Sequence, residues 1–286
     1  MRRSLVAAQV LTLQVQGRRE FLISPAEGEA PRALMIFGHP ASRDSTCFLA
    51  EALELAESGV RSYLPDFHFS KQAADPANLR NPIREIAFRR KCISRIVHAS
   101  TLLHSMRDRK RTSHLPLIYA GKNFGAFIGG MLPNFDTRIS HYLLMAGLPD
   151  LTGFYLTSDH PVARSAREGV SREQLERYRE LTGFLNPVSL LPQSAAREMF
   201  FQFGSKDPWI DEATAFQFIN AACGDKRVMF YEDGHELECP KAKADRMNFI
   251  TSRMSEPVAV EASPRRNPFP RAEVPEPRSS DSSEGK

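Results

Sequence analysis

At 286 residues, with 42% hydrophobic and 25% charged residues and a formal net charge of +4, the chain has the composition of a soluble globular protein with one large core. Nothing approaches the ~18 consecutive apolar residues of a membrane helix, and the Arg- and Lys-rich runs at 89–91 and 107–111 have no nucleic-acid-binding motif beside them. We therefore expect neither a membrane nor a nucleic-acid partner, and interpret both runs as solvated helix faces and loop rims.

We expect no signal peptide in the first residues, because Gln9 and Gln14 interrupt the apolar run and no small-residue cleavage site follows. The four cysteines are scattered and form no CxxC pair, which argues against a zinc site or a disulfide framework and favours a reducing compartment. The histidines show no HxH or HExxH spacing. We expect a cytoplasmic protein without a metal or another cofactor.

Hydrophobic periodicity, turn residues and caps predict the elements of the first half of the chain. In order they are a β-hairpin of strands 5–15 and 19–24, a buried strand 33–40, a helix 45–58, a short strand 60–67, a loop 68–82, and a long amphipathic helix 83–109.

The second half continues the same alternation of strands and helices. The predicted elements are a buried strand 115–121, a helix 123–132, a strand 139–147, a strand-free segment 150–196 with one clear helix at 171–185, a strand with its loop 197–210, a helix 213–222, a strand with its loop 226–237, and a last helix ending near 254. The helix at 171–185 opens with Ser171 and Gln174 at the spacing of a capping box.

This alternation predicts an α/β protein, with a mostly parallel sheet that carries helices on both faces. Right-handed crossovers place every strand-to-helix loop at one end of the sheet, where sites belong. We expect one domain over residues 1–255, with a small helical lid at about 150–196. Residues 256–286 are rich in Pro, Ser and charge and poor in large apolar side chains, so they are expected to form a disordered tail.

The first candidate site residue lies between the buried strand 115–121 and the helix that follows it. Gly121 and Gly125 flank Asn123 at a strand-to-helix junction with no intervening loop. Two glycines permit a cramped turn that pushes the central side chain outward. Hydrolases place Ser, Cys or Asp at this position, whereas this chain has Asn.

Two further candidates follow the last two predicted strands. Asp207 lies in the loop GSKDPWI, and His235 in the loop EDGHEL, 28 residues later. That separation accommodates one helix and one strand. An Asp and a His in these loops are placed to be the acid and the general base of a hydrolytic triad. Taken singly, each would more often be a turn or surface-loop residue.

The stretches FFQFGSKDPWI, KRVMFYEDGHEL and YAGKNFGAFIGGML resemble the bacterial dienelactone-hydrolase-like and esterase-like α/β hydrolases over roughly residues 30–254. The resemblance implies an α/β-hydrolase fold, with Asp207 as the acid, His235 as the base and Asn123 at the place of the nucleophile. It also implies an oxyanion or substrate-binding role for Gly38, His39 and the backbone N–H of Phe124. Pro40 stands where a glycine is usual and has no N–H to donate.

A carboxamide has no hydroxyl proton that a base can remove at neutral pH, so Asn123 cannot serve as an ordinary nucleophile. Three functions remain open. The chain is an enzyme that acts on an ester or another carbonyl compound through the His235–Asp207 base, by non-covalent hydrolysis, lyase or cyclase chemistry. Alternatively, it is an inactive pseudo-hydrolase that binds a small ligand or a partner, or an inactivated variant of a serine esterase.

Overall fold

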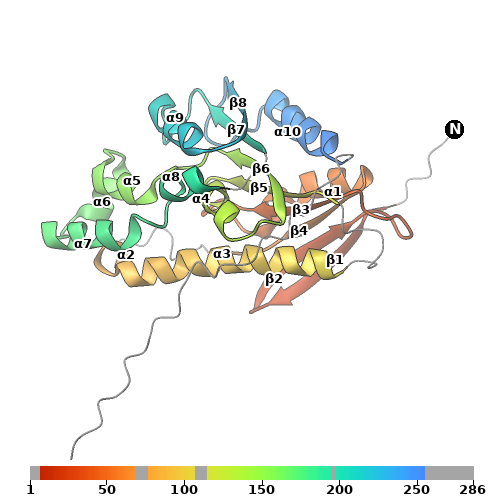
Figure 1. Ribbon diagram of the computed structural model, residues 1–286, viewed down its shortest axis with the longest axis horizontal. Coiled ribbons are helices and arrows are strands. Elements are labelled where there is room, and N and C mark those ends of the chain that lie inside the picture. The colour runs from red at the N-terminus through yellow and green to blue at the C-terminus, as the bar shows by residue number, and fades with distance from the viewer. Residues whose placement is uncertain (1–6, 68–76, 107–114, 195–197, 255–286) are drawn as a thin grey trace, which may run out of the picture.

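The computed structural model describes residues 7–67, 77–106, 115–194 and 198–254. Eight strands form one sheet in the order β1-β2-β4-β3-β5-β6-β7-β8 (Figure 1). The hairpin strands β1 and β2 run antiparallel to their neighbours, and every other pair is parallel. The strands are β1 (Gln9–Val15), β2 (Arg18–Ser24), β3 (Ala33–Gly38), β4 (Val60–Leu64), β5 (Leu117–Lys122), β6 (Ile139–Met145), β7 (Glu198–Gly204) and β8 (Asp225–Tyr231).

Helices connect the parallel strands and cover the sheet. They are α1 (Leu49–Glu57), α2 (Ala77–Arg80), α3 (Pro82–Ser105), α4 (Phe124–Met131), α5 (Leu151–Thr157), α6 (Pro161–Arg167), α7 (Arg172–Thr182), α8 (Pro187–Leu190), α9 (Glu212–Ala221) and α10 (Pro240–Ser252), with short 3-10 turns η1 (Ser45–Phe48), η3 (Leu132–Asn134) and η4 (Leu191–Gln193). In Figure 1, α3 and α4 lie on the near side of the sheet and α1 on the far side. The predicted α/β architecture is confirmed.

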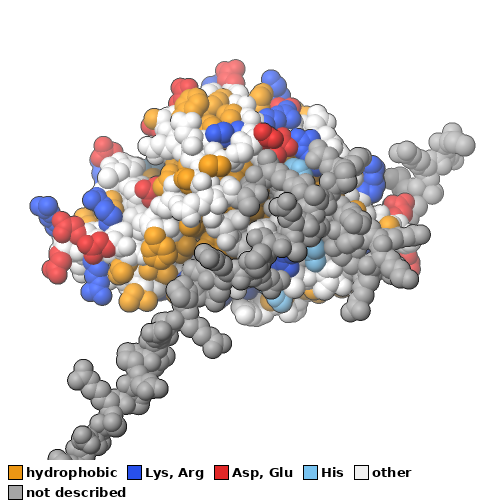
Figure 2. Space-filling model, viewed as in Figure 1, with side chains coloured by type: hydrophobic (Ala, Val, Ile, Leu, Met, Phe, Trp, Pro, Cys, Tyr) orange, Lys and Arg blue, Asp and Glu red, His pale blue; other side chains and the backbone are white. Residues whose placement is uncertain are grey.

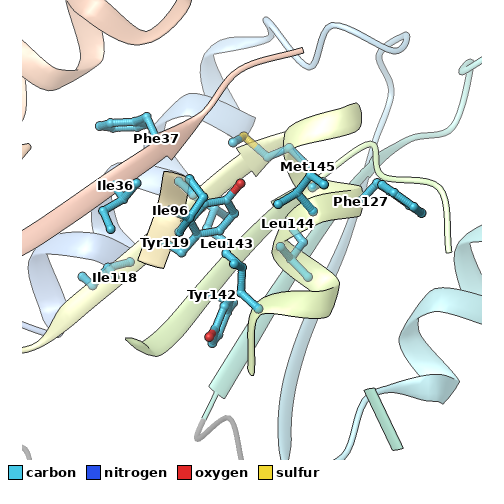
Figure 3. Close-up of a cluster of buried hydrophobic side chains, with 14 of the residues drawn as sticks. Ile36, Phe37, Ile96, Ile118, Tyr119, Phe127, Tyr142, Leu143, Leu144 and Met145 are labelled. Carbon is cyan, nitrogen blue, oxygen red and sulfur yellow. The ribbon is translucent and has the colours of Figure 1, made fainter. Parts of the chain in front are cut away.

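The centre of the core is formed by β3, β5 and β6, whose residues are buried along the whole length of each strand. Such strands are apolar on both faces because helices cover both sides of a parallel sheet. Figure 3 shows Ile36, Tyr119 and Leu144 from these three strands among the buried side chains, with Phe127 from α4 beside them. Within the described residues, no helix is long and apolar enough to cross a membrane.

Several predicted boundaries needed correction. The loop expected at 68–82 contains α2 and the first residue of α3, because the Asn81 side chain accepts a hydrogen bond from the Arg84 N–H and starts α3 at Pro82. The helix expected at 123–132 begins one residue later, since Asn123 is its N-cap. Parts of the predicted elements, at residues 1–6, 68–76, 107–114 and 195–197, and the tail from 255 lie outside the described residues.

Residues 150–194, the described part of the lid expected at about 150–196, lie between β6 and β7 and are called the lid segment below. The sequence predicted one helix here, and the capping box of Ser171 and Gln174 is present at its start. The structure has three more helices, α5, α6 and α8, each of seven residues or fewer. Figure 1 shows α5, α6 and α7 grouped at one end of the molecule. Figure 2 shows basic and acidic side chains interspersed over this end, as on an ordinary solvated surface.

Arg89 joins the lid segment to α3. The sequence placed this residue in a run of solvated charges, but its side chain is fully buried. Its guanidinium is paired with the Glu85 carboxylate and donates to the Leu185 carbonyl oxygen at 2.8 Å and to Asn186 Oδ1 at 3.1 Å. A buried arginine is tolerated where several acceptors surround it. Arg89 therefore organises the junction between α3 and the end of α7.

Candidate active site

The elbow, residues 121–125, is the cramped turn between β5 and α4. Asn123 has φ 54° and ψ −116°, a region that residues with a side chain rarely adopt. A Cβ on Gly121 would collide with the Gly125 backbone, and a Cβ on Gly125 would collide with the Gly38 carbonyl. The two glycines thus allow β5, α4 and the end of β3 to meet, and they leave the Asn123 side chain pointing out of the turn.

The Asn123 carboxamide makes two hydrogen bonds. Its Oδ1 accepts from the backbone N–H of Phe124 at 2.7 Å, and its Nδ2 lies 2.7 Å from Nε2 of His235. The first bond occupies the N–H that was expected to stabilise an oxyanion. The second occupies the nitrogen that was expected to act as base. One side chain therefore bridges the two groups that a hydrolase would present to its substrate.

Asp207 holds the other side of the His235 ring. His235 Nδ1 donates to Asp207 Oδ2 at 2.7 Å, so Nε2 of the neutral ring is the acceptor for the Asn123 amide. The Asp207 side chain is 0% exposed, and its Oδ1 accepts the backbone N–H groups of Trp209 and Ile210 at 2.8 and 3.2 Å. This carboxylate is fully hydrogen-bonded and cannot rotate without breaking two backbone contacts.

Asn123, Asp207 and His235 thus come together from the carboxyl ends of β5, β7 and β8, as the sequence predicted they would. The three side chains form one hydrogen-bonded chain that runs from Asp207 through His235 to Asn123. Their catalytic role remains a prediction.

The His loop, residues 232–239 between β8 and α10, presents His235. Asp233 accepts the backbone N–H groups of Gly234 and Cys239, both at 2.8 Å, and these bonds hold the pKa of its carboxyl below the ordinary value. A Cβ on Gly204 would collide with the carbonyl oxygens of Asp233 and Gly234. The loop is therefore packed closely on the end of β7. Asp207 lies in the loop that follows this strand.

The His39 ring bonds within the protein, and the oxyanion or substrate-binding role expected of this residue stays a prediction. Its ring is buried, Nδ1 donates to the Pro40 carbonyl oxygen at 2.8 Å, and Nε2 accepts from the Phe67 N–H at 3.0 Å. Burial lowers its pKa, partly offset by the hydrogen bond to Pro40 and the charge of Asp66. Both ring nitrogens are used within the protein, so the side chain ties the loop after β3 to the loop after β4. The lack of a side chain at Gly38 is explained by its close contact with Gly125 of the elbow.

A cavity of about 880 Å³ lies between the lid segment and the start of α9, next to Asp207. Its walls include Trp209, Phe154 and Asp150, and the ring of His160 stacks on Trp209 with centroids 3.8 Å apart. The Trp209 centroid is also 6.1 Å from that of His235. The sequence analysis did not single out Trp209, although its place two residues after Asp207 was a usable indication. Among the described residues, no group of three or more His, Cys, Asp or Glu side chains is arranged to hold a metal ion.

No protein-family model and no curated protein matches the sequence. Solved structures do match the fold. A candidate dienelactone hydrolase from Klebsiella pneumoniae subsp. pneumoniae MGH 78578 is 13% identical, with a TM-score of 0.58 over 87% of this chain and 98% of that one. An acetyl xylan esterase from Paenibacillus sp. R4 is 16% identical, with a TM-score of 0.62 over 86% and 88% of the two chains. Est1E from Butyrivibrio proteoclasticus is 10% identical, with a TM-score of 0.60 over 86% and 99%.

The sheet order, the crossover helices and these similarities establish that the chain has the α/β-hydrolase fold. Its structural neighbours include dienelactone-hydrolase-like and esterase proteins.

Proposed function

We propose that this protein is an enzyme that acts on an ester or another carbonyl compound, with His235 as general base and Asp207 as the group that orients it. The observation that carries the proposal is the unbroken chain of hydrogen bonds from buried Asp207 through His235 to Asn123. A fully bonded carboxylate and a histidine in a single tautomer are what general-base catalysis requires.

The reaction proceeds without a covalent intermediate, because Asn123 has no ionisable hydroxyl or thiol. In hydrolysis, Nε2 of His235 removes a proton from a water molecule as the water oxygen attacks the carbonyl carbon. The same proton then passes to the leaving group as its bond to carbon breaks. For this step the Asn123 Nδ2 must leave His235, and it is then free to donate to the substrate.

A second candidate function is ligand binding without turnover. It is favoured by the bond from the Phe124 N–H to Asn123 Oδ1, which places the protein's own amide oxygen on the oxyanion donor. A substrate carbonyl would have to displace this oxygen before it could be stabilised. In this alternative the pocket binds a small ligand, and His235, oriented by Asp207, forms hydrogen bonds to it.

Restoring a nucleophile tests whether the site is a working hydrolase scaffold. In Asn123→Ser the hydroxyl meets the base that Asp207 orients, and the Phe124 N–H is released for the oxyanion. Hydrolysis of small chromogenic esters is expected to rise about 10²-fold or more over the parent chain. Asn123→Ala is the matched control, since it also releases the Phe124 N–H but supplies no hydroxyl. Equal rates for the Ser and Ala variants would show that no covalent route was created.

Assays of the parent chain itself distinguish the proposed enzyme from a protein that only binds a ligand. The parent chain is tested on esters, lactones and thioesters beside His235→Ala and Asn123→Ala. Turnover that His235→Ala abolishes supports the proposed enzyme. If only Asn123→Ser is active on this panel, the proposal is overturned in favour of ligand binding.

A further inference from the structure

Lys122 lies immediately before Asn123, yet its side chain takes no part in the contacts described above. It is 9% exposed and points into a small cavity of about 180 Å³ whose lining also includes Cys47, Glu51 and Arg246. Neither Asn123 nor His235 lines that cavity. The Lys122 side chain therefore lies on a different side of the elbow from the Asn123 carboxamide, which bonds His235.

From there Lys122 reaches the His loop. Its Nζ donates to the backbone carbonyl oxygen of Glu236 at 2.5 Å and to Glu236 Oε2 at 2.6 Å. Burial acts to raise the pKa of the Glu236 carboxyl, but the hydrogen bond and charge of Lys122 outweigh it, and the pKa is held below its ordinary value. The two residues are the chain neighbours of Asn123 and His235.

We propose that Lys122 is a positioning residue that fastens the His loop to the elbow and so sets the 2.7 Å separation of Asn123 and His235. The contact to a backbone carbonyl fixes the main chain of the loop directly next to His235, which a contact between side chains alone would not do. The proposal rests on the proposed function in that the positioned ring is the general base. Misplacement of a catalytic group by about 1 Å can cost up to 10²-fold in rate.

Lys122→Met tests the proposal because it keeps the length of the side chain and removes the donors. Only one partner of the ion pair is replaced, but Glu236 is 49% exposed and can turn to water, so no buried charge is left unpaired. The readout is the imidazole of His235 in ¹⁵N-histidine-labelled protein, assigned by its loss in His235→Gln. The parent chain is expected to show one tautomer with a downfield Nδ1 proton shared with Asp207. Lys122→Met is expected to broaden or lose that proton.

Lys206→Met is the matched control. Lys206 also forms an ion pair with a glutamate at the His loop, at 2.9 Å to Glu232, but both side chains are well exposed and no backbone carbonyl is involved. This variant is expected to leave the His235 resonances unchanged. Glu236→Ala is expected to act in the same direction as Lys122→Met but more weakly, because Lys122 retains the backbone carbonyl.

Activity in the Asn123→Ser background supplies a second readout. There Lys122→Met is expected to lower kcat about 10-fold or more with little change in KM. An Asn123→Ser chain without activity would count against the proposed function alone, since the resonances of His235 still report its position. A normal His235 spectrum in folded Lys122→Met, or an equal effect of Lys206→Met, would overturn the positioning role. If Lys122→Met does not fold, the shorter, uncharged Lys122→Gln takes its place, and a normal His235 spectrum in that variant overturns the role.

Discussion

Gly125 shows how closely the elbow is built against its neighbours. Its Cα faces the carbonyl of Gly38 at the end of β3, and its own carbonyl accepts a hydrogen bond from the Tyr119 hydroxyl at 2.7 Å. Both neighbours are backbone or fully buried groups, so neither can move away without a cost in free energy.

Gly125→Ala is therefore expected to lower the free energy of unfolding by about 1–3 kcal/mol, as overpacking of a core does. Gly234→Ala in the His loop is the control. It has open space around the new methyl group and is expected to stay within about 0.5 kcal/mol of the parent chain. Urea unfolding measures both. Equal stability of the two variants would show that the junction of β3 and α4 can relax.

At the same scale, the sequence predicted Asn123, Asp207 and His235 because each follows a strand and the spacing of Gly121 and Gly125 defines the turn. It did not predict the two hydrogen bonds of the Asn123 amide. Residue types indicate which groups can bond, but only the folded loops decide which partners come within reach. The contacts of the His39 ring were unpredictable for the same reason, since nothing in the local sequence shows that the ring turns inward to Phe67.

At the level of whole elements, Arg89 of α3 attaches the lid segment through hydrogen bonds, while its ion pair with Glu85 lies within α3. Arg89 and Glu85 are both buried, and Arg89 also donates to the end of α7 and to Asn186. Arg89→Met leaves the Glu85 carboxylate buried without its cation. Such a loss is expected to lower the free energy of unfolding by about 3–5 kcal/mol.

The double variant Arg89→Met with Glu85→Gln should recover part of that loss, because it removes the unpaired charge. Arg172→Met is the control, since the pair of Arg172 and Glu176 on α7 is largely exposed and is expected to contribute about 0.5 kcal/mol or less. Denaturant unfolding measures stability, and hydrogen exchange of α7 locates the change. An Arg89→Met chain as stable as Arg172→Met would contradict this account of the lid segment.

The strands and long helices were predictable because period-2 runs, buried apolar runs and caps are local. The short helices α5, α6 and α8 were not. Each has seven residues or fewer, which is below the length at which a helix is stable alone. Their formation therefore depends on packing, of α5 on α6 and α7 and of α8 on α4 and α9. The pairing of Lys122 with Glu236 joins residues 114 positions apart in the sequence, and no local sequence pattern indicates such a contact.

For the whole molecule, the buried His39 makes stability depend on pH. Its folded pKa is lowered, chiefly by burial, so the unfolded chain binds its proton more readily. The stabilisation is complete above the unfolded pKa, about 6.5, and is lost as pH falls through that value towards the folded pKa. The carboxyls with lowered pKa, such as Asp233 and Glu236, act in the same direction but only at more acidic pH, below ordinary values of 3.8 and 4.5.

The window from about pH 7.5 to 5 therefore isolates His39 among these groups. The free energy of unfolding is expected to fall with pH across it, by up to about 1.4 kcal/mol for each unit by which the pKa is lowered. His39→Gln removes this contribution and still offers an amide oxygen to the Phe67 N–H. Its stability is expected to vary less with pH than that of the parent chain. His98→Gln, at an exposed position of α3, is the control and should keep the parent slope. A His39→Gln chain with an unchanged slope would show that protonation of His39 does not limit the stability of the fold.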